Sequence, residues 1–138
     1  MPAQTALTYA RSHQQNFLAA LKHLITIPSV STAPEHKADM QRAAEWLRTR
    51  LLEIGMSHAE IYPTDGHPVV YAECLKAGPQ KPTLLIYGHY DVQPADPLEL
   101  WHNGPFEPTL DQEYLYARGA SDMKGQILAS IAAVESVL

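Results

Sequence analysis

The sequence is poor in the cysteines that form disulfides in small secreted proteins and in the basic runs that bind polyanions. Cys74 is the only cysteine in 138 residues, which excludes an intrachain disulfide and a cysteine-rich zinc site and favours a reducing compartment. Charged residues make up only 18% of the chain, and the net charge is −5 with no basic run. Nucleic acid and anionic membrane surfaces are therefore not expected as partners, and a small molecule is favoured.

Long hydrophobic runs are also absent. No stretch approaches the roughly 20 apolar residues of a membrane-spanning helix, and residues 1–22 lack the cationic and apolar regions of an export signal. Hydrophobic residues nevertheless make up 46% of the chain, enough to bury the core of one globular domain. We therefore expect a soluble, cytoplasmic protein.

The first 55 residues carry the apolar periodicity of helices. The first helix is predicted by a stripe at helical spacing, consisting of Phe17, Leu18, Leu21, Leu24 and Ile25. Pro28 ends it. Thr32 and Glu35 resemble a capping box, which predicts the start of a second helix with an apolar stripe over 40–54. Gly55 is expected to end that helix, because glycine tolerates positive φ.

The pattern then changes to that of strands. Short runs rich in Val, Ile and Tyr predict strands over 59–62, 68–75, 83–90 and 113–117. Residues 83–87 are continuously apolar, as in a central strand covered on both faces. Four prolines between residues 92 and 108 predict a long loop, and helical spacing returns from Gly125 to the last residue. This order indicates an α/β layered domain, either a natural short chain or the N-terminal piece of a longer one.

The end of the predicted central strand carries the first candidate site. Residues 85–94 read Leu-Ile-Tyr-Gly-His-Tyr-Asp-Val-Gln-Pro, so His89 and Asp91 share one face if the strand continues. A metal-binding imidazole usually donates its other N–H to a carboxylate, and this pair has the spacing to do so. A buried structural hydrogen bond explains the same pair without a metal. The other histidines have no partner at ligand spacing, and those in loops are expected to be solvated.

A second candidate lies at the next strand end, in Tyr-Ala-Arg-Gly-Ala-Ser-Asp-Met-Lys-Gly over residues 116–125. Asp122 is a hard oxygen donor beside a helix N-terminus, and the glycines allow close backbone approach. The plain alternative is that Ser121 or Asp122 caps the helix; another is anion binding at the helix N-terminus. His89 and Asp122 are 33 residues apart, so neighbouring strands would bring them to one metal or to a metal pair.

These two motifs, together with the loop from Trp101 to Phe106 and the Ile-Pro-Ser-Val-Ser loop of residues 27–31, resemble the di-zinc metallopeptidase family. That family includes carnosinase-like cytosolic dipeptidases, aminoacylase, acetylornithine deacetylase, succinyl-diaminopimelate desuccinylase and glutamate carboxypeptidase. Tyr90 and Gln93 favour the dipeptidase branch. Trp101 and Phe106 favour anchoring the long loop over touching substrate.

The resemblance implies a three-layer αβα sandwich with a mixed central sheet, incomplete at the C-terminus. Residues 1–138 would be the N-terminal portion of the catalytic domain, without its second half and without the lid and dimerisation domain. His89 would bind one zinc ion and Asp122 would bridge two. Asp91, placed in the catalytic set, would orient His89 without touching metal. The Asp122–Met123 peptide bond would be cis.

The implied activity is metal-dependent hydrolysis of the amide bond of a dipeptide or N-acyl amino acid. The implied cofactor is Zn²⁺, two ions per site, with Mn²⁺ or Co²⁺ as alternatives, and the intact enzyme would form a homodimer through the absent domain. The general base and the remaining ligands of active relatives lie beyond Leu138, so we expect this chain alone to be inactive. Two alternatives stay open: a folded piece without catalysis, and a small anion-binding α/β module.

Overall fold

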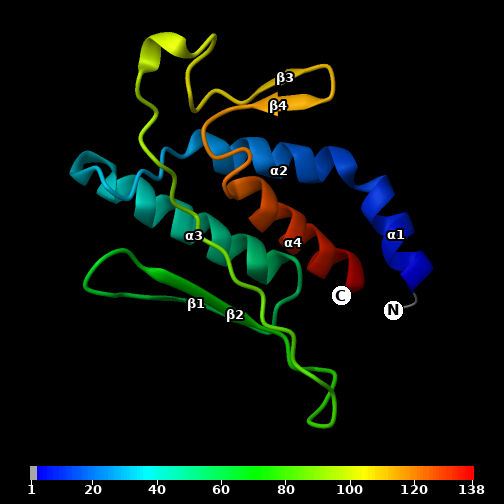
Figure 1. The fold of residues 1–138 in the computed structure, drawn as a ribbon. Helices are drawn as coiled ribbons and strands as arrows, with labels where there is room; N and C mark the ends of the chain where they lie inside the picture. The colour runs from blue at the N-terminus through cyan, green and yellow to red at the C-terminus, as the bar shows by residue number, and fades with distance from the viewer. Residues whose placement is uncertain (1–2) are drawn as a thin grey trace.

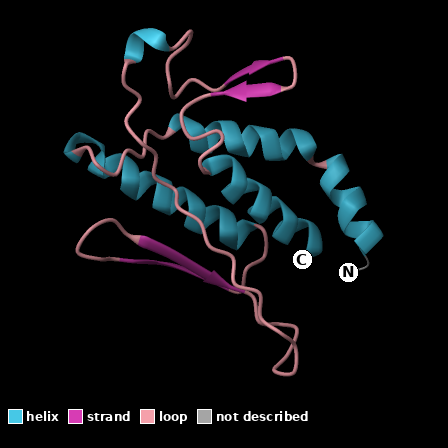
Figure 2. Cartoon of the chain, viewed as in Figure 1, coloured by secondary structure: helices cyan, strands magenta, loops and turns pink. Residues whose placement is uncertain are grey.

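A computed structural model describes residues 3–138 as four α-helices and two separate hairpins (Figures 1 and 2). In chain order the elements are α1 (Ala3–Ser12), α2 (Gln14–Thr26), the 3₁₀ helix η1 (Pro34–His36), α3 (Lys37–Glu53), β1 (His58–Tyr62), β2 (Val69–Glu73), the 3₁₀ helix η2 (Leu98–Leu100), β3 (Thr109–Asp111), β4 (Tyr114–Tyr116) and α4 (Lys124–Val137). Helix α4 packs against α1 and α2, and α3 packs against the β1–β2 hairpin. No helix in residues 3–138 is long and apolar enough to cross a membrane.

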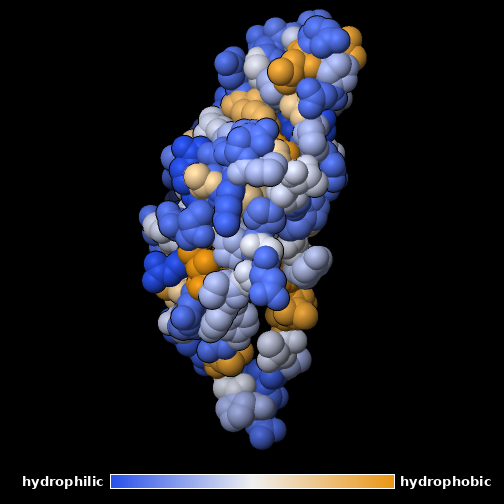
Figure 3. Space-filling model, turned by 90° about the vertical axis from the view of Figure 1, so that its left-hand side faces the viewer, coloured by the Kyte–Doolittle hydropathy of each residue, from blue (hydrophilic) through white to orange (hydrophobic). Residues whose placement is uncertain are grey.

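The core forms where α2, α3 and α4 meet. Most of its buried residues come from the predicted helical stripes, and Ile27 directly follows α2; the set is Leu24, Ile27, Ala43, Leu47, Ile54 and Ile131. Burying such aliphatic side chains contributes on the order of 1.5–3 kcal/mol each. Outside this core, the face in Figure 3 carries hydrophobic residues as separated patches among polar ones.

The predicted helices are present, with two differences at their starts. The predicted stripe of residues 17–25 lies on α2, and α1 precedes it as a separate helix, because the chain turns at His13. The Thr32–Glu35 capping box is wrong: α3 begins after η1, and His36 precedes it without a side-chain cap. Gly55 ends α3 with φ +98°, as predicted, in the conformation that glycine tolerates best.

The three-layer sandwich with a mixed central sheet is not present in the described residues. Strand β1 pairs antiparallel with β2, and β3 pairs antiparallel with β4, as two sheets of two strands each. Residues 83–91 run without strand structure, and Leu85 and Tyr87 are 86% and 85% exposed. A continuously apolar run becomes a central strand only between neighbouring strands, and none lies beside it in residues 3–138. The described residues form a mixed α/β fold.

The loop over residues 92–108 is confirmed, and its anchor is Trp101. The indole Nε1 donates to the carbonyl of Ala95 at 2.8 Å, and the Arg118 guanidinium lies 5.4 Å from the ring centroid. A cation over an indole face is attracted by the ring quadrupole. The contact ties this loop to the end of β4, just before Asp122.

Lys124 joins the start of α4 to the end of α2. Its side chain is completely buried, and Nζ donates to the carbonyls of Leu24 at 3.0 Å and Ile27 at 2.6 Å. These carbonyls belong to the last turn of α2, where a positive charge is favourable. Burial lowers the pKa of Lys124 to about 8, against opposing attraction from Asp39 and Asp91.

The lowered pKa of Lys124 predicts a specific pH dependence of stability. The folded chain binds fewer protons at this site than the unfolded chain between pH 8 and its ordinary value of 10.5, so stability rises with pH through that window. From about pH 7.5 to about pH 9.5, the free energy of unfolding of the wild type should gain about 2 kcal/mol relative to Lys124→Met. Urea denaturation at each pH measures this difference.

The matched control for this prediction is Lys81→Met, which removes the amine of an exposed lysine outside α4. A wild-type minus Lys124→Met difference that stays flat with pH would show that Lys124 is not held in its buried position.

Candidate functional site

The segment that carries His89 and Asp91 is held in place by the loop after α2. Val30 and Val92 form a parallel bridge, and the Val92 amide donates to the Ser29 carbonyl at 2.9 Å. The Ser29 hydroxyl donates to the carbonyl of Tyr90 at 2.6 Å. The extended chain therefore gains through this loop some of the backbone pairing that a neighbouring strand would supply.

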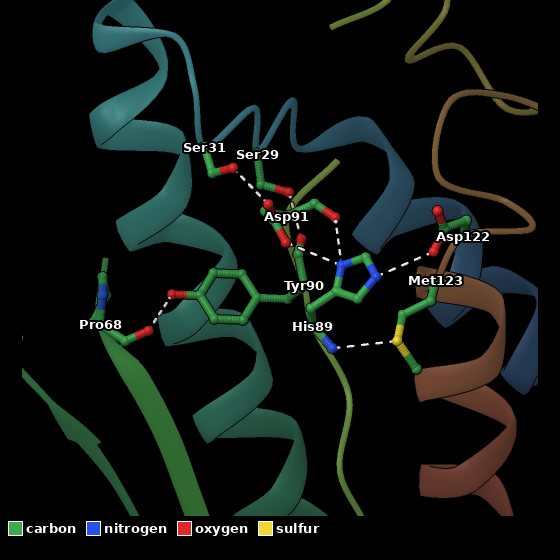
Figure 4. Close-up of polar contacts among 8 residues, drawn as sticks. All are labelled: Ser29, Ser31, Pro68, His89, Tyr90, Asp91, Asp122 and Met123. Carbon is green, nitrogen blue, oxygen red and sulfur yellow. Dashed lines mark hydrogen bonds and ion pairs between the residues drawn. The ribbon is translucent and has the colours of Figure 1, made fainter. Parts of the chain in front are cut away.

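The imidazole of His89 lies between two carboxylates (Figure 4). Its Nδ1 is 2.9 Å from Asp91 Oδ1, and its Nε2 is 3.1 Å from Asp122 Oδ1. His89 and Asp91 are half-buried, whereas the Asp122 side chain is 81% exposed. The structure therefore brings together all three residues that the sequence singled out.

The charge around His89 favours a proton or a cation on the ring. Partial burial lowers the pKa of His89, but the hydrogen bonds with Asp122 and Asp91 and the charge of Asp91 together raise it above its ordinary value. A carboxylate at hydrogen-bond distance stabilises the charged form of a neighbouring imidazole. Both ends of the ring thus face negative charge.

Asp122 lies on a tight turn between β4 and α4. Gly119 has φ +85°, and a Cβ at this position would lie 2.6 Å from a Val92 methyl group, so only glycine fits. The Asp122–Met123 peptide bond is cis, as the family resemblance implies. Met123 also contacts the first motif, because the amide of His89 lies 3.3 Å from its sulfur.

The spacing of the two ligand candidates fits a metal ion. Two donors on a tetrahedral zinc ion with bonds of about 2.0 Å lie about 3.3 Å apart. His89 Nε2 and Asp122 Oδ1 are 3.1 Å apart, while Asp91 engages the opposite nitrogen. In residues 3–138, however, no group of three or more His, Cys, Asp or Glu side chains is placed to hold a metal. The residues present fit part of a zinc site, which needs about three protein ligands per ion.

Sequence reasoning assigned no role to several residues around this pair. The Ser31 hydroxyl donates to Asp91 Oδ2 at 2.5 Å, and the Tyr90 hydroxyl donates to the Pro68 carbonyl at 2.5 Å. His67 was expected to be solvated, but its Nε2 lies 2.7 Å from the carbonyl of Ser31. The Ser-Val-Ser spacing of residues 29–31 is the one signal in the sequence, because alternate residues of an extended segment share a face.

Part of this chain is similar to a known protein family and to known enzymes. Residues 85–138 match the profile of "Peptidase family M20/M25/M40". The chain is 30% identical over 125 residues to a cysteinylglycine-S-conjugate dipeptidase from Corynebacterium striatum, covering 91% of this chain and 27% of that protein. It is 40% identical over 118 residues to a succinyl-diaminopimelate desuccinylase from Bordetella avium, covering 86% and 29%.

A solved structure agrees with these relatives. Human carnosine dipeptidase 1 superposes with a TM-score of 0.82 at 32% identity, over 96% of this chain and 30% of that one. The chain therefore spans less than a third of the length of the relatives it matches. Within that span, residues 85–138, which carry His89, Asp91 and Asp122, are similar to peptidase family M20/M25/M40.

Proposed function

We propose that this chain is the N-terminal part of the catalytic domain of a metal-dependent amide hydrolase. The observation that carries the proposal is the 3.1 Å approach of His89 Nε2 to Asp122 Oδ1, with Asp91 on the opposite nitrogen of the ring. His89 and Asp122 would ligate Zn²⁺, with Asp122 bridging a second ion. The matched family and relatives support this chemistry.

Each residue has a defined task in the proposed site. Asp91 holds the Nδ1 proton of His89, which leaves the Nε2 lone pair facing Asp122. Asp122 supplies a carboxylate at the exposed end of the turn, open to a second ion and to substrate. Bound zinc would supply Lewis-acid polarisation of the scissile carbonyl and a lowered pKa for water. The general base is not assigned to any residue of this chain.

The substrate class we propose is a dipeptide or a related N-acyl amino acid with a free carboxylate. A dipeptidase and a desuccinylase both stand among the relatives, and both names describe the cleavage of an acyl–nitrogen bond. We propose that residues 1–138 hold half of the ligand set, and that the partner strands of residues 83–87 and the remaining ligands belong to a further part of the protein. The exposed, apolar side chains of that run support this arrangement.

Metal titration tests the ligand assignment. Isothermal titration of the chain with Zn²⁺ should give weak binding that falls at least about tenfold in His89→Gln and in Asp122→Asn, because each removes one of two donors. The matched control is His58→Gln, which removes another histidine lying 3.3 Å from a carboxylate, that of Glu60. Zinc binding lost in the control but kept in the two site variants would contradict the assignment.

Hydrolysis assays test the completeness of the site. We expect the 138 residues alone to release no product from dipeptides or N-succinyl amino acids with added Zn²⁺, Mn²⁺ or Co²⁺. Ninhydrin detection of new amines measures this. Turnover that disappears in Asp122→Asn would show that the chain forms a complete site by itself, against this proposal.

The two carboxylates also predict how His89 titrates without metal. Asp122→Asn and Asp91→Asn should each lower the pKa of His89, because each removes a hydrogen bond or a charge that favours the imidazolium form. NMR titration of the histidine side chains measures the shift. The His58 resonance serves as the internal reference, because its carboxylate neighbour, Glu60, is unchanged in both variants. An unaltered His89 titration in both variants would contradict the arrangement in Figure 4.

A further inference from the structure

The hydroxyl of Ser31 lies at the far end of a hydrogen-bonded series that reaches the proposed metal position. Ser31 Oγ donates to Asp91 Oδ2 at 2.5 Å, and Asp91 Oδ1 lies 2.9 Å from His89 Nδ1. Each oxygen of the Asp91 carboxylate therefore has its own partner (Figure 4). A carboxylate held at both oxygens cannot rotate about its last bond without breaking one of these contacts.

The orientation of Asp91 matters because two carboxylates compete for the ring proton of neutral His89. The Asp91 carboxylate accepts it on Nδ1, where the Asp91 backbone carbonyl also lies 3.2 Å away, while Asp122, 3.1 Å from Nε2, would accept it there. Only the Nδ1–H tautomer leaves the Nε2 lone pair free for a metal. The side chain that fixes Asp91 therefore biases the ring towards the form that binds.

Ser31 is itself held firmly enough to act this way. The neighbouring Val30 is buried and bridges to Val92, and the carbonyl of Ser31 lies 2.7 Å from His67 Nε2. The hydroxyl is thus presented from a loop that is bonded on both sides to other parts of the chain. Little side-chain entropy is lost in aiming it, since serine has a single side-chain torsion.

Two effects of the hydroxyl oppose each other. By withdrawing charge from Asp91, it weakens that carboxylate as an acceptor, whereas by fixing Asp91 it keeps Oδ1 aimed at Nδ1. Asp91 and His89 are half-buried, so water reaches them and would replace the lost donor. A water molecule would donate to Asp91 as the hydroxyl does, but it would not fix the orientation of the carboxylate. The loss of orientation therefore determines the tautomer ratio of His89.

We infer that Ser31 is a positioning residue, which holds Asp91 so that His89 keeps its proton on Nδ1 and presents Nε2 to the metal. This inference rests on the proposed function for its biological meaning. Loss of Ser31 would change the tautomer of His89 and would leave the proposed set of metal ligands unchanged.

The test is the tautomer ratio of His89 in the metal-free chain. Long-range ¹H–¹⁵N NMR of the ¹⁵N-histidine-labelled chain, at a pH where the ring is neutral, resolves the two forms. The wild type should be mainly Nδ1–H. Ser31→Ala should shift the ratio about three- to tenfold towards Nε2–H, the range expected for one hydrogen bond, and Ser31→Thr should restore it.

Two further variants separate positioning from general loss of structure. Ser136→Ala removes a buried hydroxyl of α4 that bonds the Ala132 carbonyl and does not contact Asp91, so it should leave the ratio unchanged. If Ser31→Ala does not fold, Ser31→Val compared with Ser31→Thr removes the hydroxyl at constant volume. An unchanged ratio in the hydroxyl-free variant, or a shift towards Nδ1–H, overturns the inference.

The readout needs neither metal nor substrate, so it is independent of the proposed function. Suppose that Ser31→Ala loses the Nδ1–H form while zinc binding is unchanged by His89→Gln. That result would uphold the positioning role of Ser31 and contradict the assignment of His89 as a metal ligand. Zinc binding through His89 with an unmoved tautomer ratio would do the reverse.

Discussion

The end of α2 and the loop after it, residues 24–31, provide the common anchor on which both parts of the site depend. Lys124 donates to the carbonyls of Leu24 and Ile27, and so fixes the start of α4 two residues after Asp122. The same loop holds the other part through the Val30–Val92 bridge. His89 and Asp122 approach each other because both are held to one short stretch of chain.

This anchoring explains which features the sequence could predict. Periodicity located three helical regions and the strands β1, β2 and β4, because side-chain burial generates that pattern directly. The motifs pointed to His89, Asp91 and Asp122, which the structure brings together. The contacts that assemble them join groups 60 to 100 residues apart and mostly end on backbone carbonyls. A carbonyl is present at every position, so no residue pattern marks the one that is used.

The failure of the predicted central strand has a related cause. The apolar run over residues 83–87 has the composition of a strand buried on both faces, but a strand is defined by its neighbours, which are not found in residues 3–138. The local composition of this run indicates that it suits a buried strand. Whether a strand forms depends on pairing with strands that are distant in the sequence. The strand β3 was missed for the opposite reason, since three residues at the end of a proline-rich loop carry too little pattern.

The three candidate residues come together although residues 83–87 form no strand. Strand neighbours would fix the backbone of residues 83–87, yet His89 and Asp91 lie beyond that run, where the loop of residues 27–31 takes over. Preorganising ligands before the metal arrives reduces the ordering cost of binding. Because the contacts that place His89 and Asp122 come from α2, α4 and one loop, the geometry of these two residues depends on the helical core and not on a central sheet.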